Sequence, residues 1–352
     1  MNLTRKKRLV FFVNSYSNYL DDFVSFLQTK FNIKVYLTYK NTNFTRYKLA
    51  NKKIYELISI KNYKKKLEKF NPNIIIVGGF KHFLIKFILE YKLKNNIKIF
   101  LWLERIKKNF FFKKKIYSII YNDIFKSSDG ILAIGKEALN YYKKVNKNTF
   151  LIPYNINSKN FLKNKCKKDY FNILFVGQLI ERKGINLILS ALKKLDNKIY
   201  KKLNITFVGD GSLKNKIISY KKKNKGIKIK LHTFLSRKKL ISIYQKNNVF
   251  IFPSLYDGWG VAPMEAMASG MALIISKNCG VSEYIEDNKN GILIKPSSLD
   301  LKNAIEYYYN NPKLINYHGI KNYKFFKKSL LNSSESYKAF VSLIKKNYEN
   351  SV

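Results

Sequence analysis

Two carboxylates, three glycines and a tryptophan stand close together in the stretch Pro253–Gly270, which reads PSLYDGWGVAPMEAMASG. Asp257 is followed directly by Gly258-Trp259-Gly260, and Glu265 comes after Asp257 with seven residues between them. Glycine lets a backbone approach a ligand closely and adopt conformations that other residues avoid. Fixed negative charge beside such a backbone indicates a loop that binds a polar ligand.

The same stretch predicts a strand, a loop and a helix in that order. The apolar run Asn248–Pro253 is typical of a short buried strand. Val261–Ser269 is rich in helix formers, with Pro263 suited to a first turn and Gly270 suited to the position after the last turn. The beginning of this helix would offer free N–H groups and a positive dipole end to an anion.

This stretch resembles the signature of the GT-B glycosyltransferases, specifically the large retaining family 4. Members carry an acid, Gly-aromatic-Gly, a second acid after seven intervening residues, and then Ala-Met-Ala-x-Gly. The first acid is usually Glu, where this chain has Asp257, and Asp-Gly-Trp-Gly is interpreted as a subfamily variant. The segment FVGQLIERKG at 175–184 resembles the family's Gly-Arg-Leu-x-x-x-Lys-Gly, with Gln178 where many members have a second cation.

The resemblance implies a retaining, metal-independent glycosyltransferase without a cofactor. It would move a sugar from a UDP- or GDP-type donor to a hydroxyl of a glycan or lipid-linked acceptor, in cell-surface polysaccharide or lipopolysaccharide synthesis. Lys183, helped by Arg182, would neutralise the diphosphate without a metal ion. Glu265 would bind the ribose hydroxyls, and Asp257 the donor sugar. The other expected donor-binding residues are Gly177, Gln178, Gly209, Asp210, Leu235, Gly258, Trp259, Gly260 and Val261.

The first half of the chain offers fewer candidates. Glu104 follows an apolar run, where related enzymes often carry a histidine or an acid, so we expect it at the reaction centre; a surface carboxylate paired with Arg105 is the alternative. Gly78-Gly79 is expected to let the acceptor or a phosphate approach, or else to form a tight turn. The basic, aromatic segment 105–126 suits contact with an anionic membrane, or else forms an active-site loop and a packed helix.

Two other functions stay open at this point. One is a nucleotide-sugar or sugar-phosphate enzyme of the same fold, such as an epimerase or a phosphorylase, although no pyridoxal-phosphate lysine is identified for the latter. The other is a scaffold that binds nucleotide-sugar or a polyanion without catalysis, against which Lys183, Asp257 and Glu265 argue. For the two acids alone, a capping pair around a surface helix is the structural alternative.

Composition narrows the class of protein. The chain has 352 residues and a formal net charge of +46, with 68 Lys and Arg against 22 Asp and Glu. Lys, Asn, Ile, Tyr and Phe are all frequent, and their A/T-rich codons explain this better than a nucleic-acid partner, for which no motif is present. Cys166 and Cys279 suggest ordinary thiols in a cytoplasmic protein. No apolar run reaches the ~18–20 residues of a membrane span, so any membrane contact would be peripheral.

The order of apolar runs and amphipathic stretches predicts two α/β domains, each a doubly wound parallel sheet covered by helices. The GT-B resemblance implies that the two domains face a cleft, with an acceptor-binding domain at 1–165, a donor-binding domain at 166–330, and a C-terminal helix at 331–352 that returns to the first domain. The polar segment Asn155–Asp169 is expected to be the linker. Strands are predicted at 9–13, 34–38, 74–77, 97–101, 130–134, 173–176, 204–208, 227–232, 249–252, 272–276 and 291–294. Helices are predicted at 21–31, 61–70, 83–94, 113–126, 136–143, 185–195, 213–223, 238–246, 281–287 and 300–309.

The expected C-terminal helix has its own start signal. Asn332-Ser333-Ser334-Glu335 resembles a capping box, in which a side-chain cap is followed by Glu at the third helical position. One apolar face follows it, formed by Tyr337, Phe340, Val341, Ile344 and Tyr348. The alternative is a surface helix on the second domain.

Overall fold

The protein is described from a computed structural model. It describes residues 6–14, 16–38, 54–59, 61–79, 85–106, 115–154, 156, 161, 171–233 and 235–349. Most of the predicted linker Asn155–Asp169 and residues 107–114 of the basic segment lie outside this range. The chain forms two compact units, the first made of Met1–Ile156 with Asn332–Val352 and the second of Asn157–Leu331.

Unit 1 is built on a seven-stranded sheet in which all neighbouring strands are parallel, in the order β3-β2-β1-β4-β5-β6-β7. Its central strands are apolar on both faces, as expected for a parallel sheet covered on both sides. The strands are β1 (Arg8–Val13), β2 (Asn32–Leu37), β3 (Tyr55–Leu57), β4 (Ile74–Gly78), β5 (Lys98–Glu104), β6 (Gly130–Ile134) and β7 (Thr149–Leu151).

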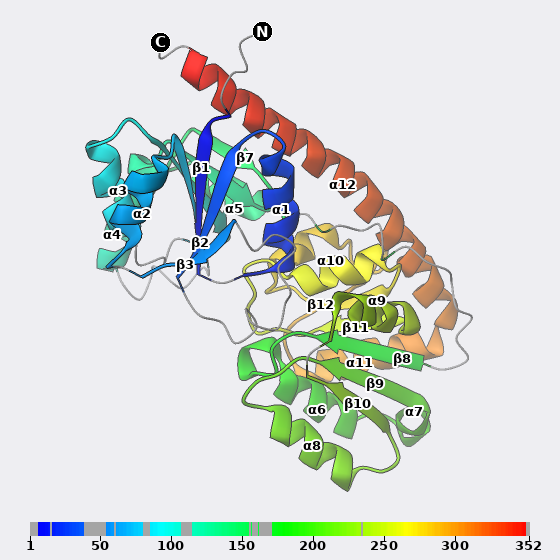
Figure 1. Cartoon of the computed structure of the whole chain (residues 1–352). Coiled ribbons are helices and arrows are strands. Elements are labelled where there is room, and N and C mark those ends of the chain that lie inside the picture. The colour runs from blue at the N-terminus through cyan, green and yellow to red at the C-terminus, as the bar shows by residue number, and fades with distance from the viewer. Residues whose placement is uncertain are drawn as a thin grey trace. The chain divides into compact units, whose positions relative to one another are not determined.

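Helices cover both faces of this sheet (Figure 1). The core under Val10 and Phe12 includes residues from α2 (Tyr63–Phe70), α3 (Ile85–Leu93), α4 (Lys115–Ser127) and α5 (Lys136–Tyr142). On the other face, α1 (Asn18–Gln28) brings Phe23 against Trp102, with ring centroids 5.0 Å apart. Tyr337 from the end of the chain lies 4.7 Å from Phe23, and Phe340 lies 5.3 Å from Phe100.

Unit 2 has a six-stranded parallel sheet in the order β10-β9-β8-β11-β12-β13. Its strands are β8 (Phe171–Val176), β9 (Leu203–Val208), β10 (Lys228–His232), β11 (Val249–Phe252), β12 (Ala272–Ser276) and β13 (Ile292–Ile294). One face packs on α6 (Ile185–Lys193), α7 (Asn197–Lys202), α8 (Lys214–Lys223) and α11 (Ser298–Asn310). Figure 1 shows α9 (Arg237–Lys246) and α10 (Val261–Ala268) on the opposite face.

Two predictions of local structure are wrong, and three short elements were not predicted. The helix expected at 281–287 is only a short 3₁₀ helix, η2 (Gly280–Tyr284), because the chain turns at Asp287, which bridges to Gly291. The capping box at Asn332 does not start a helix, since α12 runs without interruption from Pro312 to Glu349. The sequence analysis did not predict β3, β7 and α7, because these elements are too short to show a periodic pattern.

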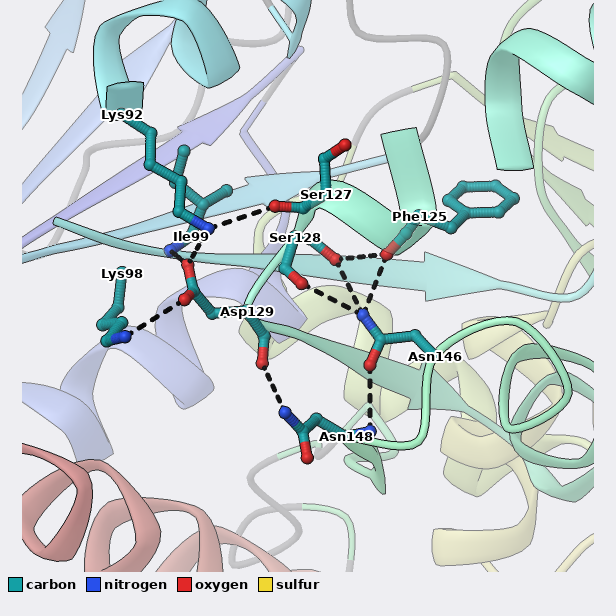
Figure 2. Close-up of polar contacts among 9 residues, drawn as sticks. All are labelled: Lys92, Lys98, Ile99, Phe125, Ser127, Ser128, Asp129, Asn146 and Asn148. Atoms are coloured by element: carbon teal, nitrogen blue, oxygen red, sulfur yellow. Dashed lines mark hydrogen bonds and ion pairs between the residues drawn. The ribbon is translucent and has the colours of Figure 1, made fainter. Parts of the chain in front are cut away.

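A partly buried polar cluster stabilises the amino-terminal side of the unit 1 sheet (Figure 2). The carboxylate of Asp129 accepts the backbone N–H of Ile99 at 2.8 Å and pairs with Lys92 at 2.8 Å and Lys98 at 3.3 Å. The amide of Asn146 donates to the carbonyl oxygens of Phe125 and Ser128. These bonds hold the residues just before β6 against the beginning of β5, at the edge of the sheet opposite the carboxyl ends of the strands.

Candidate active site

The candidate site of unit 2 lies where the strand order of its sheet reverses. From β8 the chain proceeds to β9 and β10 on one side, and β11, the other neighbour of β8, leads to β12 and β13. The loops that leave β8 and β11 therefore diverge to opposite faces and leave a crevice at their carboxyl ends. These two loops contain the FVGQLIERKG segment and the Asp257–Gly260 stretch.

The two loops are joined by an ion-pair cluster. After β8 the chain forms a 3₁₀ turn, η1 (Glu181–Lys183), and Lys183 Nζ pairs with Asp257 Oδ2. Arg182 Nη1 lies 3.7 Å from the same carboxylate oxygen and donates to the carbonyl of Tyr256 at 2.9 Å. The Lys183 ammonium also lies 5.0 Å from the centre of the Phe252 ring. Both predicted cations and the first predicted acid thus meet in one place.

The backbone permits this contact because a glycine follows the cations. Gly184 has φ +79°, and a Cβ there would lie 2.3 Å from the carbonyl oxygen of Pro253. The loops are further tied by the Leu255 N–H, which donates to the carbonyl of Arg182 at 2.9 Å. Only glycine allows the η1 turn to press so closely on the end of β11.

The Gly-Trp-Gly segment presents buried amide groups. Gly258, Trp259 and Gly260 are all buried, and in the described part of the chain their backbone N–H groups donate no hydrogen bond. Gly260, at φ +103°, is the residue immediately before α10, so this segment lies at the positive end of the helix dipole. Buried donors of this kind need an acceptor, which a phosphate or sugar oxygen would supply.

The tryptophan side chain itself belongs to the core. Trp259 is 1% exposed, donates from Nε1 to Met264 Sδ at 3.0 Å, and packs edge-to-face on Tyr284 with ring centroids 5.1 Å apart. Its indole therefore fixes the loop against α10 and η2, and only its backbone is available to a ligand. Val261 is the first residue of α10 and is half-buried.

Glu265 lies on α10 and is almost fully buried, with 7% exposure. Its Oε2 accepts a hydrogen bond of 2.8 Å from the hydroxyl of Tyr244 on α9. Burial, together with the neighbouring Glu265 charge, raises the pKa of Tyr244, so its hydroxyl stays a donor across the physiological pH range. Sequence reasoning missed Tyr244, whose only signal was a place on the apolar face of a predicted helix.

Gly270 ends α10 as predicted. It follows the cap residue Ser269 with φ +66°, and the Met271 N–H returns to the carbonyl of Ala266 at 3.1 Å. Here the first part of α12 touches the loop, because a Cβ on Gly319 would lie 2.2 Å from the carbonyl oxygen of Gly270. The Asn322 amide adds a hydrogen bond of 2.9 Å to the carbonyl of Met271.

The remaining donor candidates line the same edge of the sheet. Gly177 and exposed Gln178 follow β8, and Gly209 follows β9. Gly209 lies so close to Gly177 that a Cβ on Gly209 would be 1.8 Å from the Gly177 carbonyl oxygen. Asp210 is exposed and lies 3.8 Å from Lys214. Leu235 is half-buried just before Ser236, the N-cap of α9, while the neighbouring Phe234 lies outside the described residues.

The unit 1 candidates occupy the carboxyl-terminal edge of their own sheet. Gly78 ends β4 beside β1, where that strand order reverses, and a Cβ there would lie 2.8 Å from Val13 Cγ1. Gly79 has φ +88°, with no atom within 4 Å of an added Cβ. Glu104 ends β5 and accepts the Tyr154 hydroxyl at 2.9 Å. Arg105, the expected surface partner of Glu104 in the alternative interpretation, pairs with Glu137 at 2.6 Å.

The described residues contain no group of three or more His, Cys, Asp and Glu side chains placed to hold a metal ion. Within the same ranges, no helix combines the length and apolar character needed to cross a membrane. The polar groups of the unit 2 site are two cations, two carboxylates, a tyrosine hydroxyl and three backbone amides.

Comparison with known proteins finds related sequences over the part of the chain that holds this site. Residues 157–325, most of unit 2, match the family model of glycosyl transferases group 1. An uncharacterized glycosyltransferase of Methanocaldococcus jannaschii is 31% identical over 189 residues, 53% of this chain and 52% of the relative. A 41.2 kDa protein from the cps region of Klebsiella pneumoniae is 26% identical over 254 residues, 65% of this chain and 66% of the relative. The matches thus span about half to two thirds of these relatives' length.

Solved structures define the fold more completely. HepE of Anabaena, in complex with UDP-glucose, superposes with a TM-score of 0.78 at 13% identity, covering 95% of this chain and 99% of HepE. Sucrose-phosphate synthase of Thermosynechococcus elongatus gives a TM-score of 0.78 at 15% identity, covering 98% of this chain and 100% of that one. The two Rossmann-like units, with seven and six parallel strands, match the GT-B architecture of glycosyltransferase structures.

Proposed function

We propose that the protein is a glycosyltransferase that takes a sugar from a nucleoside diphosphate donor of the UDP or GDP type. The observation that carries this proposal is the joining of Lys183, Arg182 and Asp257 across the two loops at the strand-order reversal of unit 2. Cations and buried amides on these two loops suit a diphosphate, and buried Glu265 on α10, the helix that follows the Gly-Trp-Gly segment, suits a pair of ribose hydroxyls. The relation of unit 2 to group 1 glycosyltransferases supports the same assignment.

Different residues of the site would bind different parts of the donor. When the glycosidic bond to the donor breaks, negative charge develops on the leaving diphosphate, and Lys183, Arg182 and the amides of Gly258–Gly260 stabilise it. These groups would do so without a metal ion or other cofactor. Glu265, which accepts a hydrogen bond from Tyr244, would hold the nucleoside part, and Asp257 would contact the donor sugar once Lys183 turns to the phosphate.

The acceptor is assigned to unit 1. We propose that Gly78 and Gly79 form part of its binding edge and that Glu104, held by Tyr154, faces the acceptor hydroxyl or the donor sugar. The acceptor is a glycan or a lipid-linked glycan of cell-surface polysaccharide or lipopolysaccharide synthesis, on the cytoplasmic side, with segment 105–126 contacting the membrane. Transfer with retention of anomeric configuration belongs to the same proposal, on the resemblance of the signature to the retaining family.

A donor screen tests the proposal. The purified protein is heated with a panel of UDP- and GDP-sugars, and the donors that raise its melting temperature are assayed for transfer or slow hydrolysis. We expect Glu265→Gln to abolish the stabilisation, whereas Glu306→Gln, whose carboxylate pairs with Lys302 on α11, retains it. Stabilisation by no nucleotide-sugar would overturn the proposal. Binding without any turnover would instead indicate a scaffold, and the anomer of the product, observed by NMR, tests retention.

A further inference from the structure

Basic residues are distributed very unevenly within unit 2. Residues 193–230 contain thirteen lysines against two aspartates, whereas residues 247–300 contain three lysines against six acidic residues. A genome-wide preference for lysine codons would raise the lysine content of both stretches. The contrast therefore indicates that positive charge is concentrated on one part of this unit.

The basic stretch lies on neighbouring elements of unit 2. Apart from the largely buried strand β9, it forms α7, α8 and the start of β10, the edge strand of the sheet. The ends of α7 and α8 are in contact, since the hydroxyls of Tyr200 and Tyr220 lie 3.5 Å apart. Figure 1 shows α8 alongside β10 at the side of unit 2 away from α9 and α10. We call the exposed lysines of α8, the following turn and β10 the α8 face: Lys216, Lys221, Lys222, Lys223, Lys225, Lys228 and Lys230.

A hollow of about 450 Å³ lies within the α8 face. Ile217, Ile218 and Leu231 form its apolar lining, and Lys221, Lys222 and Lys225 complete it. Ile218, Lys221 and Lys222 follow one another at helical spacing on α8, and Lys225 lies in the turn after it, so apolar and basic side chains line the same hollow. Long lysine side chains can lay their methylene groups along such a surface while the ammonium groups reach a charged partner.

Six of the seven lysines of the α8 face have no carboxylate at ion-pair distance among the described residues. Within the described residues, no carboxylate lies at ion-pair distance from Lys216, Lys221, Lys222, Lys223, Lys225 or Lys230. Like charges gathered on one helix repel each other, which a solvated surface tolerates and an anionic partner would relieve. The α8 face also lacks exposed aromatic rings of the kind that stack on nucleic-acid bases.

We propose that the α8 face is a docking surface for an anionic phospholipid bilayer. Lipid phosphates would contact the lysines, and the apolar hollow would accept the upper part of an acyl chain. The combination of a basic rim with an apolar hollow fits the boundary between lipid head groups and hydrocarbon. The surface is separate from the donor-site loops and holds whether or not the proposed transfer reaction is correct.

Vesicle sedimentation tests the docking surface directly, using the full-length chain without nucleotide. We expect the protein to sediment with phosphatidylcholine vesicles containing phosphatidylglycerol, but not with phosphatidylcholine alone, at an ionic strength of about 0.15 M. Replacing Lys221, Lys222 and Lys225 by Gln should weaken the partition coefficient about a hundred-fold, since each basic residue at an anionic surface contributes about five-fold. Ile218→Ser should weaken it further without changing the charge.

The matched control removes the same charge elsewhere in unit 2. Lys313, Lys324 and Lys328 are exposed on α12, and their replacement by Gln should leave vesicle binding within about two-fold of wild type, because the net charge alone has little effect at this salt. Equal loss in both triple variants, or no preference of the wild type for anionic vesicles, would overturn the proposal. So would a stronger loss of RNA binding than of vesicle binding in the α8 variant, because the surface would then serve nucleic acid. All variants are checked for unchanged melting temperature.

Discussion

Asp257→Asn should lower the free energy of unfolding of the ligand-free protein and tighten its binding of nucleoside diphosphates. In the free protein, the Asp257 carboxylate is the counterion of Lys183, and the two side chains are only 11% and 13% exposed. Removing one partner of a fully buried pair costs about 3–5 kcal/mol. Because both groups keep some contact with water and the Asn amide oxygen can still accept a hydrogen bond, we expect about 2 kcal/mol here. For a unit of this size that is a fall in melting temperature of about 4–8 °C.

The same variant should respond more strongly to ligand. In the wild type, a diphosphate must compete with Asp257 for Lys183, whereas in the variant the ammonium is already available. A charge-assisted hydrogen bond of about 1.5 kcal/mol corresponds to roughly ten-fold tighter binding of UDP or GDP. Calorimetric titration measures the dissociation constant, and thermal denaturation with and without nucleotide measures the stability.

The control for Asp257→Asn is Glu286→Gln, which removes an equally charged group whose partner, Lys289, is highly exposed. Exposed pairs contribute about 0–1 kcal/mol, so this variant should behave like wild type in both assays. If Asp257→Asn binds nucleotide more weakly than wild type, Lys183 is not the group for which carboxylate and phosphate compete. If its melting temperature is unchanged, the pair does not stabilise unit 2.

Three further outcomes are expected. Tyr244→Phe removes the hydroxyl that orients Glu265 and should weaken nucleotide binding about ten-fold by calorimetry. The control Tyr220→Phe, on α8, should leave nucleotide binding unchanged. Equal nucleotide affinity of the two variants would show that Tyr244 does not contribute to the site. Gly209→Ala would place a methyl group 1.8 Å from the Gly177 carbonyl and should lower the melting temperature, unlike Gly226→Ala, whose Cβ meets Tyr200 at an ordinary 3.4 Å. Burial lowers the pKa of His318, so the unfolded chain takes up a proton below about pH 6.5 before the folded one does. Stability should therefore fall as pH drops below that value, and a urea titration of His318→Gln should show a flatter pH dependence.

The parallel sheets could be predicted because their strands are short, wholly apolar runs separated by amphipathic helices. β11 is a good example, as VFIF is buried at all four positions and is bounded by Asn248 and Pro253. α7 was missed because its six residues, NKIYKK, are too few to show a helical period. The apparent capping box at Asn332 failed because a cap needs a break in the preceding helix, and nothing in residues 312–331 supplies one.

The site could be predicted in its residues but not in its contacts. Motif spacing identified Lys183, Asp257 and Glu265 individually, since each stands in a characteristic local pattern. That Lys183 and Asp257 bind each other depends on the neighbouring positions of β8 and β11 in the sheet, which no local pattern encodes. The hydrogen bond from Tyr244 to Glu265 depends in the same way on how α9 and α10 lie side by side on one face.

The contact between Gly270 and Gly319 restricts which residues two positions far apart in the sequence can accept during evolution. Glycine inside a helix such as α12 costs about 1 kcal/mol relative to alanine, so a protein under selection for stability would be expected to replace Gly319. The approach to the Gly270 carbonyl prevents that replacement while α12 rests on the end of the Asp257–Gly270 stretch. We therefore expect the two positions to change together during divergence, with larger residues at 319 only in relatives whose last helix has moved away from this loop.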